Sequence, residues 1–123
     1  MNIRRLPDAE LRVMQAVWDC KAPVSRADIE NILDREYPMA ATTILTLLSR
    51  LVEREFITIE KIGRSNYYTP VISRQDYIAA QSRSFLDKLC GGDIRAFATA
   101  LCDSGLSRSD IEELRRLLEK GEL

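Results

Sequence analysis

Residues 42–70 read TTILTLLSRLVEREFITIEKIGRSNYYTP and decide the fold. The first part predicts an amphipathic helix, because its apolar residues recur at helical spacing. These apolar residues are Ile44, Leu47, Leu48, Leu51 and Val52. Two short β-forming runs follow at residues 57–59 and 66–69, with Gly63 and Arg64 between them. The segment therefore predicts a helix that is followed directly by a β-hairpin.

The polar face of this helix is unusual for a solvated surface. It carries Thr42, Thr43, Thr46, Ser49 and Arg50. Threonine forms helices less well than Glu, Lys or Gln, by roughly a few tenths of a kcal/mol per residue. Short hydroxyl side chains let a helix approach base edges in the major groove, and an arginine can hold a phosphate. We expect this helix to bind DNA. The alternative is a threonine-rich surface helix that has no partner.

The predicted hairpin has a basic tip. Lys61 and Arg64 lie close to Gly63, which supplies the backbone freedom of a tight turn. Many hairpins carry such charges only for solubility. A basic hairpin directly after a DNA-binding helix is typical of a winged helix, whose wing lies on the DNA backbone or in the minor groove. The predicted DNA-binding residues are therefore Thr42, Thr43, Thr46, Arg50, Lys61, Gly63 and Arg64.

Helix signals precede this segment. A first helix begins after Pro7 and ends near Cys20. Ser25 can cap a second helix, with Asp28 at the return position of a capping box, and we expect that helix to run to the next proline. The DNA-binding helix begins near Ala40, which has no capping side chain. Its first N–H groups therefore remain available to water or to a phosphate.

The remainder of the chain is predicted to be helical. Glycine-containing breaks separate helices at residues 73–89, 93–102 and 107–120. We therefore predict a mainly α protein with a small β-hairpin wing. An N-terminal winged helix-turn-helix domain occupies residues 1–72, and a C-terminal three-helix dimerisation region occupies residues 73–123.

The C-terminal helices carry apolar stripes that need a common core. A part of this size seldom buries enough surface alone, since below about 40 residues oligomerisation or crosslinks are usually required. We expect a second copy of the chain to cover these stripes, and the alternative is that the helices fold back on the N-terminal domain. The predicted dimerisation residues are Tyr77, Ile78, Phe85, Leu89, Ile94, Phe97, Leu101, Ile111, Leu114 and Leu118.

Composition excludes several classes of protein. The 123 residues have a formal net charge of −1, which does not suit a protein that coats nucleic acid by bulk attraction. There is no histidine, so Ser–His and Cys–His nucleophile pairs cannot form, and no glycine-rich phosphate loop is present. We expect no enzyme, no cofactor and no bound metal. No apolar run approaches the ~20 residues of a membrane span, so we expect a cytoplasmic location.

Four segments resemble a known family. They are LPDAELRVMQAVWD at 6–19, TTILTLLSRLVERE at 42–55, GRSNYYTP at 63–70 and LSRSDIEEL at 106–114, and an aromatic and apolar run at 77–89 adds to them. The chain resembles the BlaI/MecI family of penicillinase repressors over nearly its whole length. The resemblance implies a homodimeric winged-helix repressor that binds palindromic operators of β-lactamase or other resistance and stress genes.

The resemblance also implies a mode of release. Family members leave DNA when a membrane sensor linked to a protease leads to cleavage within the middle C-terminal helix. The corresponding position here is Ala100–Leu101, which lacks the Asn-Phe pair of well-known members. The partners implied are thus double-stranded operator DNA, a second copy of the chain and a sensor-linked protease, with no membrane contact.

Two other interpretations remain open from the residues themselves. The near-neutral charge also permits a winged helix that binds a protein instead of DNA. Cys20, Cys90 and Cys102 permit a metal-responsive or redox-responsive regulator, in which Cys90 and Cys102 face each other across the glycine break. No C-x-x-C spacing favours a thiolate metal site.

Overall fold

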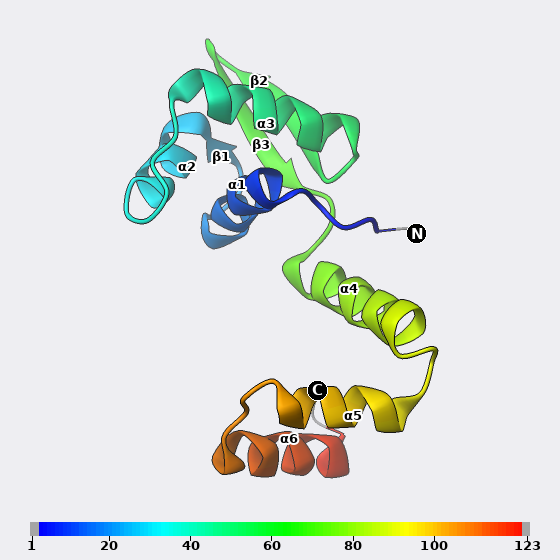
Figure 1. Ribbon diagram of the computed structural model, residues 1–123. Coiled ribbons are helices and arrows are strands. Elements are labelled where there is room, and N and C mark those ends of the chain that lie inside the picture. Colours follow the sequence, from blue (N-terminus) through cyan, green and yellow to red (C-terminus); the bar gives the residue numbers. More distant parts are fainter. Residues whose placement is uncertain (1–2, 122–123) are drawn as a thin grey trace. The chain divides into compact units, whose positions relative to one another are not determined.

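The computed structural model describes residues 3–121 and places one small sheet among helices (Figure 1). In chain order the elements are α1 (Asp8–Asp19), β1 (Val24–Ser25), α2 (Arg26–Leu33), α3 (Ala41–Glu53), β2 (Ile57–Ile62), β3 (Ser65–Pro70), α4 (Arg74–Leu89), α5 (Ile94–Asp103) and α6 (Arg108–Lys120). The chain forms two compact units, Met1–Gln81 and Ser82–Leu123. The expected class, mainly α with a β-hairpin, is confirmed.

Local capping explains where α2 begins, whereas α3 begins without a side-chain cap. The Ser25 hydroxyl accepts a hydrogen bond from the Asp28 N–H at 3.1 Å, and the Asp28 carboxylate accepts one from the Ser25 N–H at 3.1 Å, as the capping box predicts. Ala40 precedes α3 without a side-chain cap, also as expected. The expectation that α2 runs to Tyr37-Pro38 is wrong. After Leu33 the chain continues in irregular turns, in which Glu36 N–H donates to the Leu33 carbonyl three residues back and Tyr37 N–H donates to the same carbonyl.

The sheet is larger than the predicted hairpin. β2 and β3 are antiparallel, and their closing pair, Ile62 and Ser65, leaves Gly63 and Arg64 as the turn. Gly63 has a φ of 64°, which a glycine adopts without strain. β1 adds a third strand beside β3, giving the order β1-β3-β2. Sequence reasoning missed β1, because two residues are too few to show an alternating pattern.

The N-terminal unit has one hydrophobic core between α1, α2, α3 and the sheet (Figure 1). The apolar face of α3 supplies Ile44, Leu48 and Leu51, each 0% exposed. Val13 and Val17 of α1 are equally buried. Burying such side chains contributes roughly 1.5–3 kcal/mol each, so the orientation of α3 about its own axis is fixed by this core.

One charged side chain lies inside this core. Glu10 of α1 is 2% exposed, and its carboxylate accepts a hydrogen bond from Arg54 Nε at 2.8 Å. Arg54 directly follows α3 and is 41% exposed. The pair thus ties the start of α1 to the end of α3.

The first turns of α4 belong to the N-terminal unit. This unit therefore extends beyond residue 72, where the sequence predicted the end of the N-terminal domain. Tyr77 is 6% exposed, and its hydroxyl oxygen accepts a hydrogen bond from the Leu6 N–H at 2.9 Å. Its ring also packs against Trp18 at 5.7 Å and Phe56 at 5.8 Å between centroids. Tyr77 therefore has little surface left for a second chain, and its predicted place among the dimerisation residues is corrected to the core.

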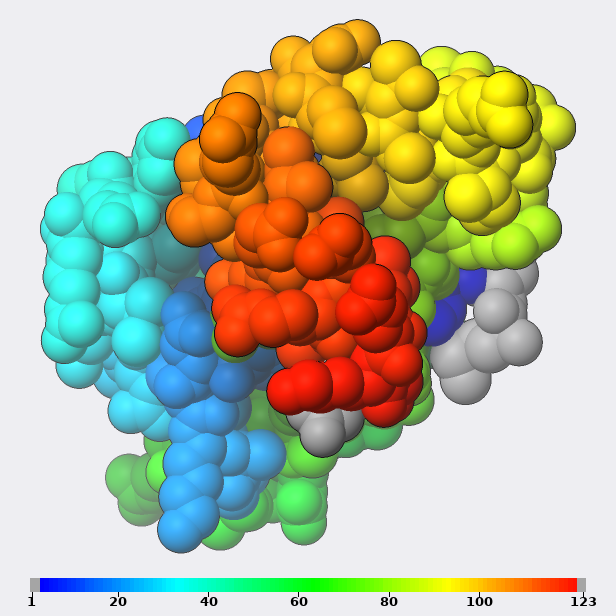
Figure 2. Space-filling view, turned by 90° about the horizontal axis from the view of Figure 1, so that it is seen from below, coloured from blue at the N-terminus to red at the C-terminus, as the bar shows by residue number. Residues whose placement is uncertain are grey.

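The C-terminal unit differs from the N-terminal unit in how little of its helical surface is buried. α5 and α6 lie side by side (Figures 1 and 2), and neither helix has a buried residue. Phe85 and Phe97 make an edge-to-face contact with 5.6 Å between ring centroids. Leu89, Ile94 and Leu118 are 75%, 66% and 59% exposed. Within the part of the chain that the structure describes, none of the helices has the length and apolar character that a bilayer crossing requires.

The Glu10–Arg54 pair predicts an asymmetric response to mutation. Arg54→Met leaves the Glu10 carboxylate buried without a partner, so we expect a loss of about 3–5 kcal/mol in the free energy of unfolding. Glu10→Gln keeps an oxygen for the half-exposed arginine, so the expected loss is about 1 kcal/mol. Urea denaturation measures both, and Arg116→Met on exposed α6 is the control. Equal losses in the two core variants would contradict the assignment.

Candidate nucleic-acid interface

The predicted polar face of α3 is solvent-exposed. All of its predicted members lie on the surface, opposite the buried apolar stripe: Thr42, Thr43, Thr46, Ser49 and Arg50. No predicted side chain is turned into the core. The helix therefore presents small hydroxyl groups and one guanidinium to whatever approaches it.

Two hydroxyl groups on this face are oriented by the helix itself. Thr46 Oγ1 donates to the Thr42 carbonyl at 3.0 Å, and Ser49 Oγ donates to the Leu45 carbonyl at 3.1 Å. Their protons are thus engaged, but each oxygen retains acceptor capacity and each side chain has a fixed direction. Thr46 can therefore accept a hydrogen bond from an amino group and offer its methyl group to an apolar contact.

The start of α3 can receive an anion. Ala40 makes no side-chain cap, so the N–H groups of the first turn have no acceptor from the helix. They also lie at the positive end of the helix dipole. Thr42 and Thr43 place their hydroxyls at the same end, so a phosphate there would meet both N–H and O–H donors.

The wing carries the other cations. Lys61 and Arg64 are exposed at the end of the β2–β3 hairpin, beside Gly63. Nothing lies within 4 Å of a Cβ placed on Gly63, so this glycine serves the turn and not a close packing contact. Among residues 3–121, no carboxylate forms an ion pair with Arg50, Lys61 or Arg64. Their charges are therefore available to phosphates.

Sequence reasoning missed Leu45. This residue lies beside the polar face of α3 and is 41% exposed. A hollow of about 220 Å³ adjoins it, lined by Ser25, Arg26, Ala27, Leu45, Ser65, Asn66 and Tyr68. The start of α2, the middle of α3 and the start of β3 meet here. The signal was present in the sequence, because Leu45 falls outside the apolar stripe.

The predicted dimerisation residues are distributed unevenly. Phe97, Leu101, Ile111 and Leu114 are half-buried within the C-terminal unit. Exposed members comprise Ile78, Phe85, Leu89, Ile94 and Leu118. The predicted cleavage residues Ala100 and Leu101 are half-buried on α5.

The cysteines do not converge on a site. Cys20, Cys90 and Cys102 are free thiols. Burial raises the pKa of Cys20, and the carboxylates of Asp28 and Asp19 raise it further. A neutral thiol is a poor nucleophile and metal ligand, so Cys20 lends no support to cysteine-based sensing. Across the described residues, no group of three Cys, Asp or Glu side chains is placed to hold a metal ion.

Known proteins are similar to this chain in sequence and, over its N-terminal part, in structure. The penicillinase repressor family matches residues 6–120. A penicillinase repressor of Bacillus licheniformis is 31% identical over 120 residues, covering 97% of this chain and 93% of the relative. A penicillinase repressor of Staphylococcus aureus is 32% identical over 111 residues, covering 89% of this chain and 87% of the relative.

Solved structures agree for the N-terminal part. The solution structure of monomeric Bacillus licheniformis BlaI with the blaP half-operator has a TM-score of 0.50 and 32% identity, and covers 61% of this chain and 90% of that chain. The BlaI DNA-binding domain alone gives a TM-score of 0.52, with the same identity and coverage. The winged-helix fold is therefore confirmed.

These relatives are repressors and not enzymes, which confirms the expectation from the missing catalytic residues. Because the family match spans nearly the whole chain and the two penicillinase repressors share 31% and 32% of their aligned residues with it, this chain belongs to the penicillinase repressor family.

Proposed function

We propose that this protein represses transcription by binding palindromic operator DNA as a homodimer. The observation that carries the proposal is the exposed face of α3, where hydroxyl side chains and the unpaired Arg50 lie next to a basic wing. α3 enters the major groove, and Arg64 holds the flanking backbone. The half-operator complex of the Bacillus licheniformis relative supports this assignment.

The C-terminal unit supplies the second half of the proposal. α5 and α6 are amphipathic, yet neither has a buried residue, and their apolar side chains include the exposed Ile94 and Leu118. Such a surface is stable in water when a second copy covers it. The two-fold symmetry of the dimer then requires two operator half-sites. Their centres lie about 34 Å apart, or a multiple of that spacing.

The proposed targets are β-lactamase genes or other resistance genes, since relatives include penicillinase repressors and the methicillin resistance regulatory protein MecI of Mammaliicoccus sciuri. Repression ends by proteolysis at Ala100–Leu101. Both residues lie inside α5, so a protease requires that helix to open locally before the backbone is accessible. Cutting there separates α6 from α4 and breaks the dimerisation unit.

Leu45 has a specific part in this proposal. An exposed leucine on the groove-facing side of α3 can contact the C5-methyl group of a thymine, which the major groove displays. Thr46 beside it offers a hydrogen-bond acceptor. Together they distinguish bases, while Arg50 and the wing cations hold phosphates.

Replacing Arg64 and Thr46 separates positioning from base recognition. Arg64→Ala should weaken binding to all DNA sequences alike and reduce the salt slope by about one unit, because one phosphate contact is lost. Thr46→Ala should cost ~1–3 kcal/mol only on the operator. Gel-shift titrations at several salt concentrations measure both effects, with Arg116→Ala as the control. If both variants bind like the parent, the DNA-binding assignment fails.

The Leu45 contact is tested on an operator selected from random DNA. Leu45→Ala should lower the affinity for that operator by about 1 kcal/mol. Replacing each thymine in turn by deoxyuridine removes only the methyl group. At the contacted position, the losses of binding free energy from Leu45→Ala and from the deoxyuridine replacement should not add. Fluorescence anisotropy measures the double-mutant cycle, and Arg116→Ala, on exposed α6, serves as the control. Additive effects at every thymine would refute the contact.

The dimer proposal is tested at Leu118. Leu118→Glu places a charge on a side chain that is 59% exposed in the monomer, so the monomer fold should be kept while the dimer dissociation constant rises at least about tenfold. The neighbouring Glu119→Gln is the matched control. Sedimentation velocity follows the 14.0 kDa monomer. A parent protein that stays monomeric at micromolar concentration would overturn the proposal.

A further inference from the structure

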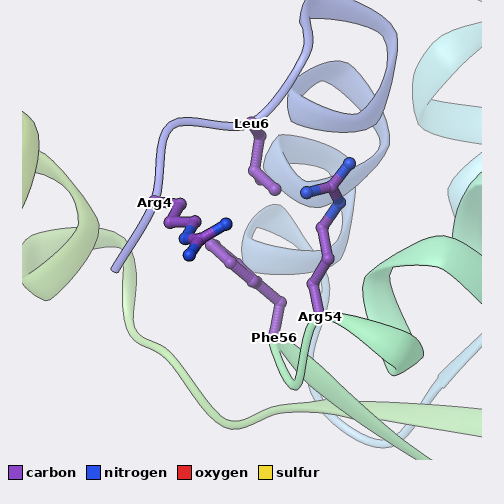
Figure 3. A pocket seen from close by; sticks show the side chains of 4 residues that line it. All are labelled: Arg4, Leu6, Arg54 and Phe56. Atoms are coloured by element: carbon purple, nitrogen blue, oxygen red, sulfur yellow. The ribbon is translucent and has the colours of Figure 1, made fainter. Parts of the chain in front are cut away.

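A hollow of about 230 Å³ lies in the N-terminal unit, away from the exposed face of α3. Figure 3 shows Arg4 and Leu6 of the N-terminal segment facing Arg54 and Phe56 of the turn that follows α3. Leu6 and Phe56 are 1% and 3% exposed, so they form an apolar base. The two arginines supply the charged part of the lining.

The charge of the hollow is not balanced. Arg54 is held by Glu10 through its Nε at 2.8 Å, which fixes the direction of the guanidinium. Its terminal nitrogens have no hydrogen-bond partner among residues 3–121, and Arg4 has neither a hydrogen bond nor an ion pair within the same range. Two cations with one carboxylate leave a net charge of about +1. This excess positive charge favours a ligand that carries a single negative charge.

The hollow is distinct from the proposed DNA surface. Arg54 turns toward α1, where it contacts Glu10, whereas Thr42 and Arg50 lie on the exposed face of α3. The hollow also adjoins the start of α4, because Tyr77 accepts the Leu6 N–H and packs its ring against Phe56. Its lining therefore comes from two segments of the N-terminal unit and does not depend on bound DNA.

We propose that this hollow binds a small organic monoanion that has one carboxylate and one compact apolar group. The carboxylate lies between Arg4 and the terminal nitrogens of Arg54, which are hydrogen-bond donors suited to its two oxygens. The apolar group lies on Leu6 and Phe56. The volume is below the ~300–1,000 Å³ typical of sites for drug-sized ligands, so the ligand is of the size of a single ring or a short branched chain.

The test uses the full-length protein without DNA and sodium benzoate as the probe. Titration at constant ionic strength, followed by backbone amide chemical shifts, should give saturable changes at residues 4–6 and 54–56. Acetate keeps the carboxylate without the ring, and benzyl alcohol keeps the ring without the charge. Each should bind at least about tenfold more weakly than benzoate, because each makes half of the contacts.

Variants locate the site. Arg4→Ala should weaken benzoate binding about five- to tenfold, and Arg4→Lys should recover part of the loss, because it keeps the charge but not the planar fork. Arg5→Ala is the matched control, since Arg5 is an adjacent arginine that lies outside the hollow and 3.9 Å from Asp8. Unsaturable shifts, equal binding of acetate, or equal weakening by Arg5→Ala would each overturn the proposal.

Discussion

The burial of one face of α3 against α1 is the constraint on which the rest of this structure depends. Ile44, Leu48 and Leu51 are wholly excluded from solvent, and together their burial is worth several kcal/mol. Turning the helix by a quarter of a turn would expose them. The core therefore decides that threonines and Arg50 point outward, although none of these polar residues contributes to the packing. Sequence-specific recognition, in the function we propose, is thus a consequence of hydrophobic burial on the opposite side.

Periodicity and capping predicted most of the fold because they are local signals. The stripe in α3, the box at Ser25 and the turn at Gly63 each depend on residues within one or two turns of chain. What the sequence could not show depends on distant partners. β1 exists because Val24 and Ser25 lie beside β3, and Tyr77 is a core residue because its hydroxyl reaches Leu6. Neither relation leaves a pattern in the neighbouring residues.

The same distinction between local signals and contacts of distant residues applies to the candidate site. Exposed hydroxyls and wing cations were predictable, since a helix that presents threonines to solvent is unusual enough to notice. Leu45 was overlooked because an apolar residue in a helix is usually assigned to the core. The hollow at Arg4 and Arg54 was also beyond prediction, because its four lining residues come from two segments that meet only after folding. Arg54 itself is positioned by Glu10, which lies at the start of α1.

The near-neutral charge of the chain places a requirement on the function we propose. Nonspecific affinity rises with the number of phosphates that a protein neutralises, and each protomer offers few unpaired cations on this surface, chiefly Arg50, Lys61 and Arg64. One protomer alone would therefore discriminate weakly against the excess of nonspecific DNA. Joining two protomers doubles the phosphate contacts and the base contacts in one binding event. In the function we propose, the exposed apolar side chains of α5 and α6 are thus as necessary to operator recognition as the hydroxyls of α3.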